Sequence, residues 1–186
     1  MQNNTDRDIL LWKQIRRDDL VALSELYNIY IDALYSYGMK YTRDTDRVKD
    51  CIHDLFLDIY KYRKTLSDVT NVEYYLLKSL KRKVSKPYFG KLKVIPSGVS
   101  TMNLMQIEDS VEQVIIKEET VSEYSSKLEN ALFNLPVKQR EVIFFRYHME
   151  KSYEEIALLT ENTIESVRTI VYRAIKRLRA NLQKDS

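Results

Sequence analysis

The sequence contains few of the residues that interrupt helices. Its 186 residues include 3 Gly and 3 Pro, the two types least tolerated inside an α-helix. With 44% hydrophobic and 31% charged residues, the chain is also unlike a disordered tail. No stretch approaches the ~18 consecutive apolar residues of a membrane span, so no membrane insertion is predicted. These features favour a globular all-α protein.

Cysteine and histidine are also scarce, with one Cys and two His in the chain. Cys51 cannot form an internal disulfide, and its place on an apolar helical face predicts a buried thiol in a reducing compartment. The polar N-terminus, MQNNTDRD, lacks the apolar segment of a signal peptide, so we predict a cytoplasmic protein. His53 and His148 have no third ligand at suitable spacing. We therefore expect no metal site. No paired carboxylates, nucleophile–base set or phosphate-cradling glycine loop stands out either, so we expect no cofactor and no enzymatic activity.

The formal net charge of +3 is too small to indicate a nucleic-acid partner, but the charge is unevenly distributed. Lys78 to Lys93 holds seven Lys or Arg and no acid. Met105 to Glu129 holds seven acids and two Lys, whereas Thr163 to Ser186 holds six Lys or Arg and two acids. Two basic segments therefore lie on either side of an acidic one.

The segment from Ser152 to Arg179 has the pattern of a helix-turn-helix. Ser152 and Glu155 form an S-x-x-E capping box, which predicts a helix start. The polar run from Thr160 to Thr163 predicts a turn, with Thr163 placed to cap a second helix. In that helix the apolar residues recur with helical spacing at Val167, Ile170, Val171, Ala174, Ile175 and Leu178. The pattern alone leaves open a DNA-binding motif and an ordinary helical hairpin with a basic face.

Three further helices are predicted in the N-terminal half after a weak amphipathic segment at Trp12 and Ile15, and two more precede the helix-turn-helix. Starts are expected at Asp18 or Asp19, at Asp44 or Thr45, and at a T-x-x-E box of Thr70 and Glu73. Proline, glycine and serine interrupt any period between 87 and 110, and Pro136 opens a later helix. We therefore predict two small helical domains, 1–86 and 111–186, joined by a flexible linker over 87–110.

The helix after Thr70 combines tyrosines with an exposed basic side, a combination that suits single-stranded nucleic acid. A tyrosine-rich core beneath a solvated basic face is the alternative, since the chain has 14 Tyr.

Two stretches resemble a known family. The C-terminal one resembles the promoter-binding domain of bacterial sigma factors of the extracytoplasmic-function type, within the sigma-70 family. The matching elements are Leu135-Pro136, Gln139-Arg140-Glu141-Val142, Tyr153-x-Glu155-Ile156-Ala157, Val167 and Arg173-Ala174. Glu161 stands where this family often has a turn glycine. DCIHDLFLDIYKYRK and NVEYYLLKSLKRKV resemble the N-terminal domain of the same family.

The resemblance implies an alternative sigma factor that binds core RNA polymerase and promoter DNA and directs initiation, with an anti-sigma factor as a further partner. The resemblance assigns the minus-thirty-five element to the face of the second helix that the helical pattern predicts to be exposed: Glu165, Ser166, Arg168, Thr169, Tyr172, Arg173, Lys176 and Arg177. The resemblance assigns the minus-ten element to a basic face of Tyr74, Lys78, Lys81, Arg82, Lys83 and Lys86. It assigns core binding to Asp50, His53, Asp54 and Asp58.

Two other functions stay open at this stage. One is a free-standing helix-turn-helix regulator with a helical N-terminal interaction domain, and the other is a protein-binding adaptor that contacts no nucleic acid. The exposed acidic face around Asp54 and the basic face from Lys78 to Lys86 favour large partners over an enclosed small-molecule pocket.

Overall fold

Helices account for all the regular structure in the described part of the chain, which confirms the all-α prediction. The computed structural model describes residues 2–86 and 119–184. Eight helices occur within them: α1 Gln2–Arg16, α2 Leu20–Gly38, α3 Thr45–Tyr62, α4 Val72–Val84, α5 Glu119–Phe133, α6 Val137–Tyr147, α7 Tyr153–Thr160 and α8 Ile164–Lys184. The predicted linker and the start of the predicted acidic helix lie outside the described residues.

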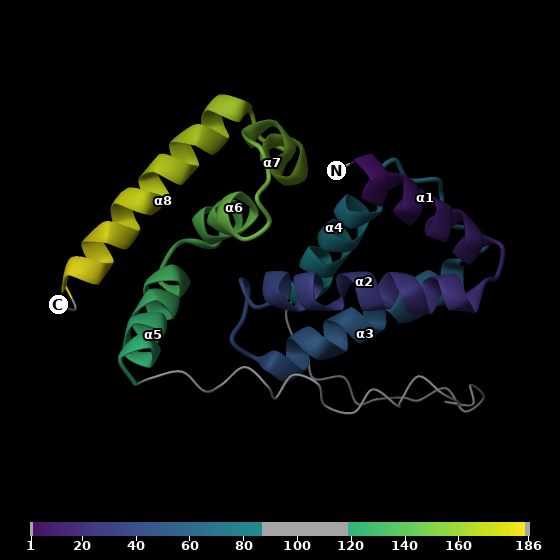
Figure 1. The fold of residues 1–186 in the computed structure, drawn as a ribbon, viewed down its shortest axis with the longest axis horizontal. Coiled ribbons are helices and arrows are strands. Elements are labelled where there is room, and N and C mark those ends of the chain that lie inside the picture. The colour runs from purple at the N-terminus through teal and green to yellow at the C-terminus, as the bar shows by residue number, and fades with distance from the viewer. Residues whose placement is uncertain (1, 87–118, 185–186) are drawn as a thin grey trace.

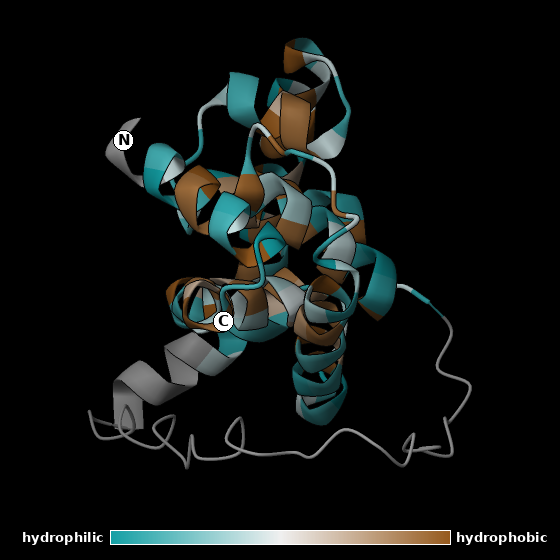
Figure 2. Cartoon of the chain, turned by 90° about the vertical axis from the view of Figure 1, so that its right-hand side faces the viewer, coloured by the Kyte–Doolittle hydropathy of each residue, from teal (hydrophilic) through white to brown (hydrophobic). Residues whose placement is uncertain are grey.

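The helices form two groups along the chain (Figure 1). Helices α1 to α4 make up the N-terminal group, and α5 to α8 make up the C-terminal group. Apolar residues gather where helices face one another, and polar ones cover the outer turns (Figure 2). None of the described helices combines the length and apolar character needed to span a bilayer.

Side-chain caps fix the starts of α2, α3, α7 and α8 where the sequence places them. Asp19 accepts hydrogen bonds from the amides of Val21 and Ala22, and Asp44 accepts one from the amide of Arg47. These carboxylates satisfy amides that have no partner inside the helix, so each start is set locally.

The predicted start of α4 is wrong by one residue. Asn71, not Thr70, adopts the extended N-cap conformation and accepts a hydrogen bond from the amide of Tyr74. Asparagine is at least as good an N-cap as threonine, so the helix begins one position later. Glu73 therefore does not complete a capping box, and its carboxylate lies 2.7 Å from the Lys151 ammonium of the C-terminal group.

A close approach of two helices explains the glycine at the end of α2. A Cβ atom built on Gly38 would lie 2.5 Å from Cγ1 of Val48 in α3. Val48 is fully buried and has no free space to move into. Gly38 therefore lets α2 and α3 pack closely.

The N-terminal group buries a core contributed by all four helices. Its largest fully buried side chain is Trp12, whose indole N–H donates to the carbonyl of Ser67 at 3.1 Å. Cys51 is half-buried rather than buried, and the pKa of its thiol is raised chiefly by that burial.

The hydrophobic core continues from the N-terminal group into the C-terminal group. The Tyr37 ring in α2 lies 5.4 Å from the ring of Phe145 and 5.7 Å from that of Phe144, both in α6. Tyr37 and Phe145 are among the most buried residues of the chain. The two groups therefore share apolar packing as well as polar contacts.

Candidate nucleic-acid interface

Helices α7 and α8 form the predicted helix-turn-helix. Both bonds of the Ser152–Glu155 capping box are present at the start of α7. Helix α7 ends at Thr160, and Glu161 follows in the left-handed conformation with a φ of 55°. The hydroxyl of Thr163 then accepts a hydrogen bond from the amide of Ser166 at 3.2 Å, as predicted.

One side of α8 packs inward and the other faces solvent. Val167, Val171 and Ala174 are buried against the other C-terminal helices. The predicted contact residues of this helix are all exposed: Glu165, Ser166, Arg168, Thr169, Tyr172, Arg173, Lys176 and Arg177. The exposed face thus begins with small or polar residues near the helix N-terminus and becomes more basic further along.

An aromatic ring positions one of these cations. The guanidinium carbon of Arg168 lies 5.6 Å from the centroid of the Tyr153 ring, and that of Arg146 lies 4.9 Å from the same ring. Such contacts restrict an otherwise flexible side chain. Helical periodicity does not identify this arrangement, because the three residues come from three different helices.

The basic face of α4 is less exposed than the sequence suggests. Arg82 and Lys86 are exposed, whereas Tyr74, Lys78, Lys81 and Lys83 are partly buried. Lys83 pairs with Asp58 of α3 at 2.6 Å. Lys78 and Lys81 instead pair with carboxylates of the C-terminal group. The expectation of a solvent-facing basic side therefore holds for two of its five cations.

The predicted polymerase-binding residues do share an exposed face of α3. Asp50, His53, Asp54 and Asp58 all lie on its solvent side. Leu57 lies on the same face with 42% of its surface exposed, and the sequence reading missed it. Its spacing of three and four residues from Asp54 and His53 is the signal that could have identified it.

A buried carboxylate between the two groups was not predicted. Glu141 in α6 is 3% exposed, and its Oε1 atom accepts hydrogen bonds from the hydroxyls of Tyr37 at 2.7 Å and Tyr41 at 2.8 Å. The Lys81 ammonium donates to both carboxylate oxygens, at 2.8 and 2.9 Å. Three donors from the N-terminal group thus compensate one buried charge from the C-terminal group.

The surroundings of Glu141 also affect the two phenols. Burial, followed by the charge of Glu141, raises the pKa of Tyr37. Burial, the neighbouring Tyr37 and Glu141 raise the pKa of Tyr41. Both hydroxyls therefore stay protonated as donors at neutral pH.

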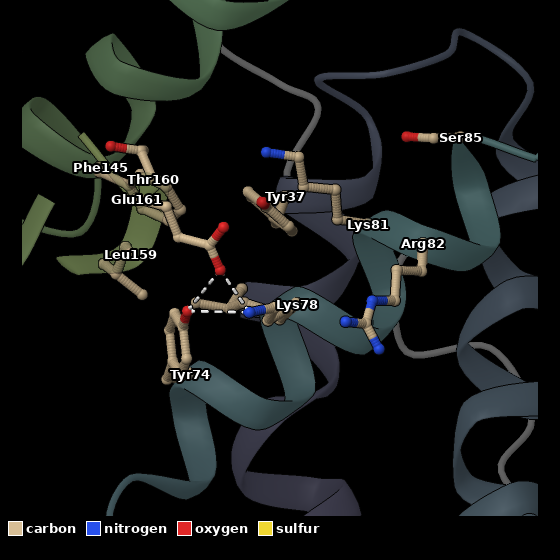
Figure 3. Close-up of a pocket in the computed structure, with 11 residues that line it drawn as sticks. Tyr37, Tyr74, Lys78, Lys81, Arg82, Ser85, Phe145, Leu159, Thr160 and Glu161 are labelled. Carbon is tan, nitrogen blue, oxygen red and sulfur yellow. Dashed lines mark hydrogen bonds and ion pairs between the residues drawn. The ribbon is translucent and has the colours of Figure 1, made fainter. Parts of the chain in front are cut away.

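A cavity of about 380 Å³ lies beside these contacts, at the junction of α2, α4, α6 and α7. Tyr74, Lys78 and Glu161 meet at one side of it, and Lys81 and Arg82 point toward it from α4 (Figure 3). Glu161 accepts hydrogen bonds from the Lys78 ammonium and, at 3.4 Å, from the Tyr74 hydroxyl. The contact with Lys78 lowers the pKa of Glu161.

Comparison with known proteins agrees with this architecture. The family model described as Sigma-70, region 4, matches residues 125–178, which include α7 and most of α8. The chain is also 24% identical over 179 residues to the ECF RNA polymerase sigma factor SigW of Bacillus subtilis (strain 168), covering 92% of this chain and 94% of SigW. The chain is an extracytoplasmic-function sigma factor of the sigma-70 family.

Solved structures share the fold of this sigma factor. CnrH, solved in complex with the cytosolic domain of CnrY, aligns with a TM-score of 0.69 and 17% identity over 97% of this chain and 99% of that one. The sigma factor RpoE from Bartonella quintana, solved with the anti-sigma factor NepR, gives a TM-score of 0.56 at 18% identity. That alignment covers 88% of this chain and 98% of RpoE.

Proposed function

We propose that this alternative sigma factor recruits core RNA polymerase to promoters through three surfaces with separate tasks. The observation that carries the proposal is the exposed face of α8, which follows a capped turn and joins small polar residues to a basic run. An N-terminal helix end of this kind fits the major groove. Glu165, Ser166, Arg168 and Thr169 would reach base edges or the adjoining backbone of the minus-thirty-five element.

The remaining exposed residues of α8 would bind the DNA backbone. Tyr172, Arg173, Lys176 and Arg177 lie beyond the first turns, where a helix leaves the groove and meets phosphates. These residues would set affinity more than sequence preference, because phosphate contacts carry no direct base information.

The basic face of α4 would contact the minus-ten element. Its Tyr74 ring and the cations from Lys78 to Lys86 provide stacking and phosphate contacts of the type used for single-stranded DNA. Arg82 and Lys86 are free to make such contacts as the structure stands, since both are exposed.

The exposed face of α3 would bind the polymerase core. Asp50, His53, Asp54 and Asp58 provide its polar part, and we add Leu57 as an apolar contact one turn from His53 and Asp54. A partly exposed leucine among acids suits an interface with an apolar centre and a charged rim. The polymerase would perform the chemistry, so this protein would be no enzyme itself and would act in the cytoplasm.

An anti-sigma factor is a further proposed partner. The structural relative RpoE was solved with one, and its fold is shared over most of this chain. An anti-sigma factor that binds here would compete with one or more of the three surfaces.

Transcription in a reconstituted system tests the proposal. Purified core polymerase would be combined with the full chain and a library of genomic fragments, and the transcripts would be sequenced. The proposal expects new start sites that share two upstream elements and that depend on the added protein. If core polymerase pulls down none of the protein and no start site depends on it, the proposal is wrong.

A further inference from the structure

Two carboxylates of the C-terminal group form ion pairs with two lysines on successive turns of α4. Glu161 pairs with Lys78, and Glu141 pairs with Lys81. Both lysines belong to the face assigned to the minus-ten element, and Figure 3 shows them at the cavity between the groups. The contacts link residues 83 and 60 positions apart, so they depend on how the groups pack rather than on local structure.

The packed state of the two groups, in which both ion pairs are formed, is called the closed arrangement here. The burial of Glu141 is favourable only in this arrangement. A carboxylate that is 3% exposed is unfavourable unless donors surround it. Its donors Tyr37, Tyr41 and Lys81 all come from the N-terminal group. Separation of the groups would remove all three donors at once and expose the Glu141 carboxylate to water.

Glu161 also contacts the N-terminal group in the closed arrangement, although its backbone conformation is unfavourable. A left-handed conformation is unfavourable for a residue other than glycine, and Glu161 has a φ of 55°. The side chain that occupies this unfavourable position reaches across to Lys78 and Tyr74. A glycine would relieve the backbone but would lose both contacts.

We propose that the closed arrangement is a self-inhibited state in which Glu141 and Glu161 take the place of nucleic-acid phosphates on Lys81 and Lys78. Carboxylates and phosphates use the same ammonium donors, so a lysine held by one is less available to the other. DNA would first meet the exposed Arg82 and Lys86 and then displace the two carboxylates. This inference rests on the proposed role of α4.

The chain offers a matched pair of substitutions for the test. Glu150 has a φ of 52° and is exposed, so Glu150→Gly removes the same charge and the same backbone strain as Glu161→Gly. No contact between Glu150 and the other group is present among the described residues. A difference between the two variants therefore isolates the contact across the groups from the effects of charge and strain.

The binding of full-length variants to fluorescently labelled single-stranded dT20 would be measured by anisotropy at low salt. Glu161→Gly should bind about two- to fivefold more tightly than Glu150→Gly, the range expected when an exposed ion pair that competes with DNA is removed. Glu141→Gln should also bind more tightly than the parent. Small-angle scattering should show a larger radius of gyration for the Glu141→Gln, Glu161→Gly double variant than for Glu150→Gly.

Substitutions of exposed cations separate failure of this inference from failure of the proposed function. The exposed Arg82 and Lys86 serve here, because neither takes part in the two ion pairs that hold the closed state. If Arg82→Ala and Lys86→Ala weaken dT20 binding while Glu161→Gly and Glu150→Gly bind alike, the self-inhibited state is refuted and the role of α4 stands. If Arg82→Ala and Lys86→Ala bind dT20 as the parent does, both ideas are wrong.

Discussion

Replacement of Tyr37 by phenylalanine would measure how strongly the buried contact joins the two groups. The substitution keeps the ring against Phe144 and Phe145 and removes the hydroxyl that donates to Glu141 at 2.7 Å. A buried hydrogen bond to a charged group contributes about 1.5–3 kcal/mol. We expect Tyr37→Phe to lower the free energy of unfolding by that amount, because Glu141 keeps its charge with one donor fewer.

Urea unfolding followed by circular dichroism provides the measurement, and a double-mutant cycle isolates the contact. In a Glu141→Gln background, Tyr37→Phe should cost clearly less than in the parent, because the charged acceptor is gone. Tyr30→Phe is the control: its hydroxyl donates to Asp8 within the N-terminal group, so its cost should be equal in both backgrounds. The reasoning is refuted if Tyr37→Phe costs the same in both backgrounds.

The raised pKa of Tyr37 predicts that the free energy of unfolding decreases at alkaline pH. The pKa of Tyr37 is raised above its ordinary value of 10.0 in the folded chain by burial and by Glu141. The folded state therefore holds this proton to higher pH than the unfolded state. The stabilising contribution is complete below pH 10 and declines above it, by at most about 1.4 kcal/mol per pH unit for each such phenol. Urea unfolding at pH 9 to 11 should show a shallower decline for Tyr37→Phe than for the parent, and parallel declines would contradict the assignment.

Four further substitutions test the surfaces and the packing. Arg168→Ala should cost about 1–3 kcal/mol of binding to minus-thirty-five duplexes and relax preference at one position, as expected for a lost contact to guanine. Arg173→Ala should weaken all duplexes alike and reduce the salt slope by about one unit; the opposite pattern in salt titrations would reverse these roles. Asp54→Lys should weaken core polymerase binding in a pull-down without unfolding the protein, whereas Asp32→Lys on α2 should not; equal binding by both would argue against the α3 face. Gly38→Ala should lower the free energy of unfolding by about 1–3 kcal/mol through overpacking, and an unchanged urea midpoint would show that α3 can shift.

The sequence predicts those parts of the fold that depend on neighbours in the chain. The caps at Asp19, Asp44, Ser152 and Thr163 each join atoms two or three residues apart, so a local pattern is enough to find them. Asn71 shows the limit of such patterns. Thr70 and Asn71 are adjacent and both are good N-cap residues, so the sequence does not distinguish them. In the structure Asn71 has the extended N-cap conformation.

The contacts between the two groups were beyond sequence reasoning. Tyr37 and Glu141 are separated by 104 positions, and helical periodicity indicates which face of a helix is apolar but not which helix will cover it. Lys81 was therefore assigned to solvent, although its ammonium pairs with Glu141 of the other group. The exposed face of α8 was predicted correctly because nothing in the described residues packs over it.

The single tryptophan has a consequence for solution experiments on this protein. Trp12 is 1% exposed inside the N-terminal group and is bonded to the Ser67 carbonyl, whereas the C-terminal group contains no tryptophan. Its fluorescence should therefore shift to longer wavelength when the N-terminal core melts and stay unchanged when the two groups merely separate. Intrinsic emission thus provides a label-free way to distinguish unfolding from domain opening in the unmodified chain.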